Sequence, residues 1–142
     1  TSLDPISKEN GPMEFIRKSH KWGKWYQPEH FAPGVSRAYE KNPEFENIPE
    51  IESNRDKYDI ISFDMNPGDL LAFHALVVHG SSANISKFRR RRGYAVRYTG
   101  KDVFYCTGKG SHLDLRNPEL KDGDCLDSKQ YPVVWEKGKF VF

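Results

Sequence analysis

Cysteine is scarce in this sequence: Cys106 and Cys125 are the only two among 142 residues. They form neither a Cys-x-x-Cys pair nor the closely spaced framework that stabilises small secreted domains. Reduced thiols are the default interpretation of such usage, because disulfides persist mainly in oxidising compartments. We therefore expect a cytoplasmic protein.

Long hydrophobic runs are also missing. No stretch of 18 apolar residues occurs, and the sequence does not open with a basic segment followed by an apolar one. These absences predict no transmembrane helix and no signal peptide within this sequence. Net charge is only +2, which gives no global reason to expect a nucleic-acid or membrane partner. Four consecutive arginines at 89–92 form a local basic patch, but no stacking aromatic motif accompanies them.

The residues that are present suit one soluble domain covering 1–142. Hydrophobic residues make up 37% of the chain and charged residues 30%, and nine Phe, seven Tyr and three Trp supply bulk for a core. Short strand-like runs with turn signals between them, and few helical patterns, predict an all-β sandwich or jelly roll. The expected strands are residues 13–17, 58–65, 70–78, 93–98 and 103–106, with the end of another at 1–6 and two short apolar stretches in the tail at 133–135 and 140–142.

Residues 24–59 interrupt this pattern with four prolines, many charges and little periodicity. Loops of this length are unusual in a compact domain unless they have a function. One interpretation is an insertion that acts as a lid over an active site. The other is a surface excursion with a short helical turn near 48–55. His30 and its neighbour Glu29, within this segment, are expected to be exposed to solvent.

The most informative stretch is residues 69–92. A turn at 66–69 predicts a hairpin between 58–65 and 70–78, and the polar loop after His79 predicts an antiparallel pair of 70–78 with 93–98. His79 would end one strand and Arg90 would begin the next, which could place both in one cavity. His74 should lie on the opposite face of its strand and have a structural role.

These residue types suit a metal site beside a carboxylate. Neutral imidazole is a common ligand for iron, and a guanidinium grips a carboxylate through two hydrogen bonds. Ser81 and Asn84 could add neutral hydrogen bonds. From the residues alone, a structural or hydrogen-bonded role is the favoured interpretation of His79, and the alternative interpretation of the arginines is a solvated basic loop.

The pattern resembles the C-terminal iron and co-substrate segment of the phytanoyl-CoA dioxygenase family, which includes the ectoine hydroxylases. The matching features are His79-Gly80-Ser81 with Asn84, Phe88 and Arg90; Pro67-Gly68-Asp69 and Phe73-His74; residues 9–14 with Ser19-His20; and residues 97–103 and 132–135. Their order and spacing, more than any single motif, carry the resemblance.

The resemblance implies a cupin-like double-stranded β-helix that uses Fe(II) and 2-oxoglutarate. It implies that His79 binds iron, that Arg90 binds the distal carboxylate of 2-oxoglutarate, and that Ser81 assists Arg90. The implied reaction is hydroxylation of an aliphatic C–H in a small metabolite or acyl-CoA. Lys18 stands where the family has the glycine of a Gly-Ser-His corner, and glycine there would permit a positive φ.

The family's other iron motif, His-x-Asp, is not found ahead of His79 in this sequence. We therefore expect the C-terminal portion of such an enzyme, with a jelly roll incomplete at its N-terminus and inactive alone. The alternative is a non-catalytic jelly-roll module for binding or assembly. His112-Leu113-Asp114 has the spelling of the motif but follows His79, and we do not expect it to bind metal.

Incomplete sheets leave unpaired edges and uncovered apolar side chains. Phe63, Leu71 and Val77 would be among the uncovered residues. We therefore expect a homodimer or larger assembly.

Overall fold

The computed structural model describes residues 1–28 and 41–141. They fall into two compact units, each treated separately below. The first unit, hereafter unit 1, comprises Thr1–Tyr26 and Phe45–Val96, and the second, unit 2, comprises Gln27–Glu44 and Arg97–Phe142.

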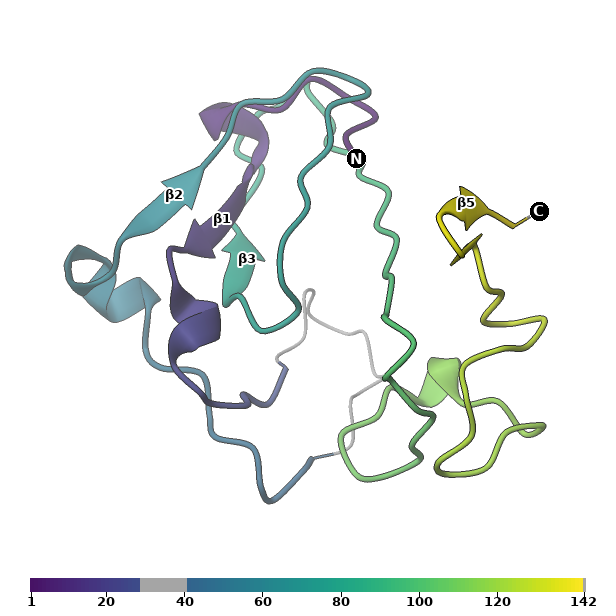
Figure 1. Cartoon of the computed structure of the whole chain (residues 1–142). Coiled ribbons are helices and arrows are strands. Elements are labelled where there is room, and N and C mark those ends of the chain that lie inside the picture. The colour runs from purple at the N-terminus through teal and green to yellow at the C-terminus, as the bar shows by residue number, and fades with distance from the viewer. Residues whose placement is uncertain (29–40, 142) are drawn as a thin grey trace. The chain divides into compact units, whose positions relative to one another are not determined.

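A three-stranded antiparallel sheet organises unit 1, with strand order β2-β1-β3 (Figure 1). Its strands are β1 (Met13–Ile16), β2 (Ile60–Ser62) and β3 (His79–Ser81). Phe15 of β1 lies opposite Ile61 on one side and His79 on the other. Three short 3-10 helices complete the regular structure of the unit: η1 (Lys8–Asn10), η2 (Ser19–Lys21) and η3 (Glu52–Lys57).

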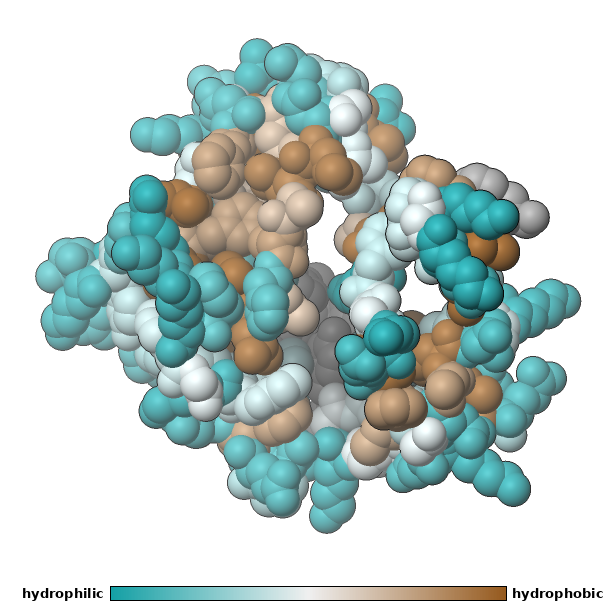
Figure 2. All heavy atoms as spheres, viewed as in Figure 1, coloured by the Kyte–Doolittle hydropathy of each residue, from teal (hydrophilic) through white to brown (hydrophobic). Residues whose placement is uncertain are grey.

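The core of unit 1 is small. Its buried apolar side chains are Ile6, Phe15, Ile16 and Met65. Ile6 and Met65 form an isolated antiparallel bridge that joins the N-terminal segment to the residues after β2. Many large apolar side chains remain at the surface (Figure 2), among them Phe88, which is 96% exposed. Burial of apolar area is the main stabilising contribution to a fold, so much of this potential stabilisation is unused in the described chain.

Two strand predictions, for residues 70–78 and 93–98, are wrong. Residues 70–78 form no strand, because their backbone groups make local bonds. The N–H of Val77 donates to the carbonyl of His74 at 3.0 Å, and the N–H of Leu76 donates to His74 Nδ1 at 3.1 Å. Local bonds of this kind compete with a β ladder. The expected hairpin with 58–65 is therefore absent, and His79 begins a strand rather than ending one.

The expected strand at 93–98 is absent for a different reason. The N-terminal residues take the available backbone partners: Leu3 N–H donates to the carbonyl of Arg92 at 3.0 Å, and Tyr94 N–H donates to the carbonyl of Thr1 at 2.9 Å. Only Gly93 forms a bridge, to Ser2. The antiparallel partner of β3 is β1, and the predicted pair of 70–78 with 93–98 does not form.

Other sequence predictions are confirmed locally. β1 lies within the predicted 13–17, β2 lies within 58–65, and η3 overlaps the helical turn expected near 48–55. Of the expected insertion or lid at 24–59, residues 29–40, including Glu29 and His30, lie outside the described residues, and its function stays a prediction.

Unit 2 has little regular structure. Its elements are η4 (Leu113–Leu115) and a hairpin of β4 (Trp135–Glu136) with β5 (Lys139–Phe140). The turn residues Lys137 and Gly138 both have positive φ, 49° and 81°, as the tight turns of two-residue hairpins require. Tyr105 is its buried aromatic residue, and the Tyr105 hydroxyl accepts a bond from the Asn117 N–H at 2.6 Å.

Strands and bridges thus predominate over helices, and the helices that occur are short 3-10 turns. This agrees with the predicted strand-rich class. The two small sheets do not amount to a complete jelly roll in the part of the chain that the structure describes.

One ion pair, between Asp4 and Arg92, fixes the N-terminal segment. It should make the stability of the fold depend on pH. Arg92 donates from Nε and Nη2 to the two carboxylate oxygens of Asp4 at 3.0 and 2.8 Å, and this bonding lowers the pKa of Asp4 from 3.8 to about 2. A depressed carboxyl pKa stabilises the fold above the unfolded value and is lost as pH falls towards the folded value. The difference in free energy of unfolding between the natural chain and Asp4→Asn should therefore be constant near neutral pH and shrink between pH 3.8 and about 2.

Denaturant unfolding of both chains across that pH range checks this expectation. Glu9→Gln is the matched control, because Glu9 is 3.6 Å from Arg89 in an exposed pair and such pairs contribute little. A difference for Asp4→Asn that does not change with pH would contradict the assignment.

Candidate functional site

A backbone carbonyl two residues earlier in the chain fixes the His79 ring in one tautomer. Its Nδ1 lies 2.7 Å from the carbonyl oxygen of Val77. A carbonyl can only accept, so Nδ1 must carry the hydrogen and Nε2 retains a free lone pair. The side chain is exposed. Metal-binding histidines typically donate their second ring nitrogen to a carbonyl or carboxylate in this way.

Two phenylalanines flank the imidazole. The Phe15 ring stacks at a centroid distance of 6.2 Å, and the Phe73 ring meets it edge-on at 4.8 Å. Phe15 and Phe73 also contact each other at 4.9 Å. Phe15 is fully anchored in the central strand, so it gives the His79 ring a rigid neighbour. Neither phenylalanine was predicted to be part of the site.

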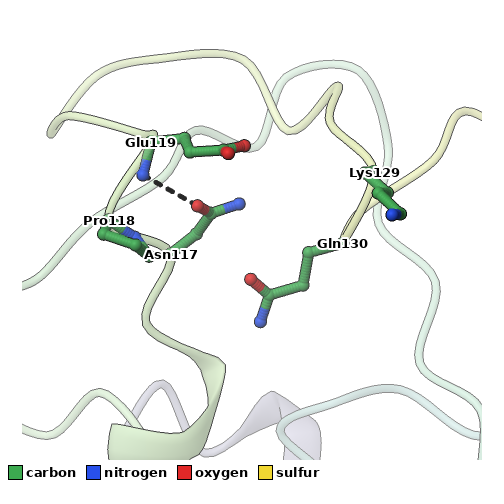
Figure 3. Close-up of a pocket in the computed structure, with 5 residues that line it drawn as sticks. All are labelled: Asn117, Pro118, Glu119, Lys129 and Gln130. Carbon is green, nitrogen blue, oxygen red and sulfur yellow. Dashed lines mark hydrogen bonds between the residues drawn. The ribbon is translucent and has the colours of Figure 1, made fainter.

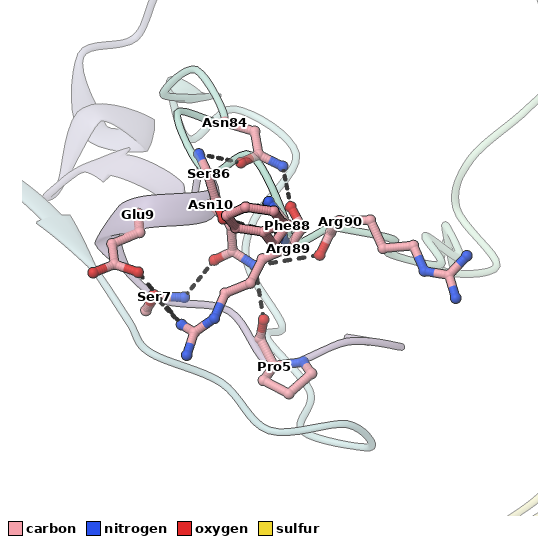
Figure 4. A network of polar contacts seen from close by, with 9 residues as sticks. All are labelled: Pro5, Ser7, Glu9, Asn10, Asn84, Ser86, Phe88, Arg89 and Arg90. Atoms are coloured by element: carbon pink, nitrogen blue, oxygen red, sulfur yellow. Dashed lines mark hydrogen bonds and ion pairs between the residues drawn. The ribbon is translucent and has the colours of Figure 1, made fainter.

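The four arginines of 89–92 differ in their partners. Arg89 lies 3.6 Å from the carboxylate of Glu9, and Arg92 is bound to Asp4. No carboxylate is bound to Arg90 among the described residues. Figure 4 shows its side chain extending away from the network that holds Arg89. Arg90 thus has a guanidinium that can receive an external carboxylate. Arg91 likewise pairs with no carboxylate among the described residues, and its Nε is buried without a hydrogen-bond partner.

The backbone of Arg90 is fixed although its side chain is not. Asn10, which is 0% exposed, donates from Nδ2 to the carbonyl oxygens of Pro5 at 2.8 Å and Arg90 at 3.3 Å. The neighbouring Gly11 has φ +78°, and a Cβ there would lie 2.5 Å from the carbonyl oxygen of Ser82. Only glycine permits this approach. The turn signal at residues 10–12 was visible in the sequence, but its contact with the loop after β3 was not.

The other two predicted polar residues differ in availability. Ser81 ends β3 opposite Met13 and is exposed. Asn84 is committed locally, since its Nδ2 donates to the carbonyl of Arg89 at 2.7 Å and its Oδ1 accepts from the Ser86 N–H at 3.0 Å. Asn84 therefore shapes the loop that carries Arg90.

Unit 1 contains a largely apolar pocket of about 290 Å³, which His79 itself does not line. Phe15 and Phe73, which flank the imidazole, also form its wall. At its edge, His20 lies with its ring 5.6 Å from that of His74. The remaining lining residues are Ile16, Arg17, Lys18, Ile61, Phe63, Leu71, Ala72 and Val77.

The corner before His20 keeps a left-handed conformation without glycine. Lys18 has φ 64° and ψ 9°, so the positive φ that a glycine would permit is adopted by lysine here. A non-glycine residue in this region costs about 1–2 kcal/mol, which the surrounding bonds must offset.

The described residues do not supply a complete set of metal ligands. Among residues 1–28 and 41–141, no group of three or more His, Cys, Asp or Glu side chains could hold a metal ion. An iron site of the expected type needs two histidines and a carboxylate, and His79 supplies one of these. His112 belongs to unit 2, and the structure identifies no metal-binding group around it.

Unit 2 contains a separate, open pocket of about 400 Å³ (Figure 3). It is lined by Asn117, Pro118, Glu119, Lys129 and Gln130. Asn117 Oδ1 accepts a bond from the Glu119 N–H at 2.9 Å, so this side chain orders the pocket wall. None of the predicted site residues lies there.

Two comparisons with known proteins found a match. A family model described as phytanoyl-CoA dioxygenase (PhyH) matches residues 1–93, a range that contains His79, Ser81 and Arg90. The human protein named peroxisomal phytanoyl-CoA dioxygenase is 25% identical over 121 residues, which cover 84% of this chain and 33% of that protein. The chain thus spans about a third of the length of this curated relative. No solved structure matches. No helix in the described residues is long and apolar enough to cross a membrane.

Proposed function

Because the chain belongs to the phytanoyl-CoA dioxygenase family, we propose that it is the part of an Fe(II)/2-oxoglutarate-dependent dioxygenase that supplies one iron ligand and the co-substrate arginine. The observation that carries this proposal is the free Nε2 of His79, whose Nδ1 is bonded to the Val77 carbonyl. The two remaining protein ligands would come from outside this sequence.

In this proposal each residue has one task. His79 donates its Nε2 lone pair to iron, and Arg90 binds the distal carboxylate of 2-oxoglutarate through its planar fork. Ser81, exposed at the end of the same strand as His79, adds a hydrogen bond to the co-substrate. The described residues do not form a complete iron site, so no step of the oxidation is assigned to them.

The neighbouring pocket supports an aliphatic substrate. Its walls are largely phenylalanine, leucine, isoleucine and valine, and an apolar wall favours C–H groups over charged ones. Phe15 and Phe73 belong to both the pocket and the surroundings of His79. The proposed reaction is therefore hydroxylation of an aliphatic C–H in a small metabolite or an acyl-CoA.

A second candidate function is a non-catalytic module for binding or assembly. The lack of a three-ligand group in the described residues favours it. A cytoplasmic location stays a prediction that rests on the free thiols of Cys106 and Cys125.

Metal analysis separates the two candidates. The 142-residue chain alone should bind Fe(II) weakly, because affinity depends on ligand number and geometry. A protein extended to include a His-x-Asp motif should bind about one equivalent of iron, and His79→Ala in it should remove that iron. His74→Ala is the control, because the Nδ1 of His74 serves the Leu76 backbone. Stoichiometric iron in the short chain would contradict the proposal and make His112 and Asp114 candidates again. An extended protein that binds no iron would favour the non-catalytic module.

We also propose that the chain self-associates through unit 1. β2 and β3 are the edge strands of its described sheet, and Phe63 and Phe73 are 46% and 45% exposed. A two-fold interface would satisfy both copies at once. Sedimentation should show a dimer or larger species at micromolar concentration, and Phe63→Glu should shift it towards monomer. A stable monomer of the natural chain would exclude this assembly.

A further inference from the structure

The side chain of Ser19 makes two hydrogen bonds, one to β1 and one to the residue before β3. Its side chain is buried, with the residue only 3% exposed. The hydroxyl donates to the carbonyl of Ile16 at 2.8 Å and accepts from the N–H of Val78 at 2.8 Å. Ser19 thus connects the end of β1 to the residue that directly precedes β3.

The N–H that Ser19 accepts belongs to the same peptide plane as the carbonyl that holds His79. The peptide between Val77 and Val78 is a rigid planar unit. Its N–H end is bonded to the Ser19 hydroxyl, and its C=O end accepts from His79 Nδ1 at 2.7 Å. The orientation of this plane therefore determines where the His79 acceptor lies.

The backbone directly before Ser19 has a strained conformation. Lys18, directly before it, has φ 64°, and residues held in this region persist where the surrounding structure determines them. Ile16 N–H also donates to the carbonyl of Val78 at 3.0 Å. Val78 is thus bonded on both sides, to Ile16 and to Ser19, immediately before His79.

We propose that Ser19 is a positioning residue for His79: through the Val77–Val78 peptide it fixes the tautomer and orientation of the imidazole. Without the hydroxyl, this peptide has one fewer restraint, and Nδ1 and Nε2 would compete for the hydrogen. The value of this role for iron binding rests on the proposed function, whereas the effect on the tautomer does not.

Side-chain nitrogen NMR of the histidines in the 142-residue chain tests this inference. In its neutral form, natural His79 should be a single tautomer with its hydrogen on Nδ1. Ser19→Ala should give a mixture of both tautomers. Ser19→Thr, which retains a hydroxyl, should restore the natural signal.

The matched control is Ser2→Ala. Ser2 is also buried, at 1% exposed, and its hydroxyl donates to a backbone carbonyl, that of Asp4. This variant loses a comparable bond in the same unit but should leave the His79 signals unchanged. Ser19→Cys provides a second test of the same size if Ser19→Ala fails to fold, and it should also give mixed tautomers.

An unchanged His79 tautomer in Ser19→Ala or Ser19→Cys would overturn the inference, as would an equal change in Ser2→Ala. In an extended protein that binds iron, Ser19→Ala should also weaken Fe(II) binding by about tenfold, the lower end for groups that orient a ligand. Failure of the proposed function would appear as iron binding that does not depend on His79, with the tautomer effect of Ser19 still present.

Discussion

Replacing Arg90 with alanine should weaken binding of 2-oxoglutarate by about 1.5–3 kcal/mol, the usual contribution of hydrogen bonds to a charged group. The metal should be retained, since Arg90 is not a proposed ligand. Calorimetric titration of the iron-loaded, extended protein measures both quantities. The effect should be large because Arg90 has no carboxylate partner among the described residues and its guanidinium is available to the co-substrate.

Arg89→Ala is the control for this experiment. The Arg89 guanidinium is already 3.6 Å from the carboxylate of Glu9 and 3.4 Å from the hydroxyl of Ser7, so its removal should hardly change 2-oxoglutarate affinity. Arg90→Lys tests geometry separately from charge, because an ammonium cannot form the two parallel bonds of a guanidinium. Natural affinity in Arg90→Ala would remove Arg90 from its proposed role.

Phe15→Ala should destabilise unit 1 by about 3–5 kcal/mol, the usual range for truncating a buried phenylalanine. Phe15 is 6% exposed, lies in the central strand, and contacts the rings of Phe63, Phe73 and His79. Few other buried apolar residues share its role, so the loss cannot be absorbed by a large surrounding core. Equilibrium unfolding in urea measures the change.

Phe88→Ala is the matched substitution. Phe88 is 96% exposed, and surface substitutions usually change stability by less than about 0.5 kcal/mol. Near-equal losses in the two variants would mean that Phe15 is not the centre of the fold. A loss confined to Phe15→Ala, accompanied by shifted His79 resonances, would support its second role beside the imidazole.

The strands that were predicted well are those that a short-range pattern of apolar residues identifies. Alternation of Met13 and Phe15 with Glu14 identified β1. The apolar residues Ile60, Ile61 and Phe63 identified the segment that contains β2. Each needs only neighbouring residues, and alternating or turn-bounded patterns report that directly.

The failures concern partners distant in the chain. Residues 70–78 are as apolar as a strand, but His74 captures local backbone groups and breaks the ladder. Residues 93–98 lose their expected partner because residues 1–3 bind the same backbone. Competition among distant segments has no signature in the periodicity of either one.

The site divides in the same way. His79 and Arg90 were predicted from residue type, spacing and family resemblance, and their roles stay predictions. The Val77 carbonyl, the ring of Phe73 and the hydroxyl of Ser19 were not, because each acts through a contact that depends on how β1 meets β3. Gly11 gave a turn signal, but its close approach to Ser82 is a tertiary feature.

Residues 7–16 contact both proposed functional residues, His79 and Arg90. This arrangement affects the order in which the site forms during folding. β1 pairs with His79, while Asn10 bonds to the Arg90 backbone across 80 positions of the chain. Contacts between such distant positions form slowly, since the entropy of closing a long loop must be overcome first. The candidate site should therefore assemble late in folding. A single local opening of residues 7–16 should release His79 and Arg90 together, so amide hydrogen exchange at Phe15 and at the backbone around His79 should give the same free energy of opening.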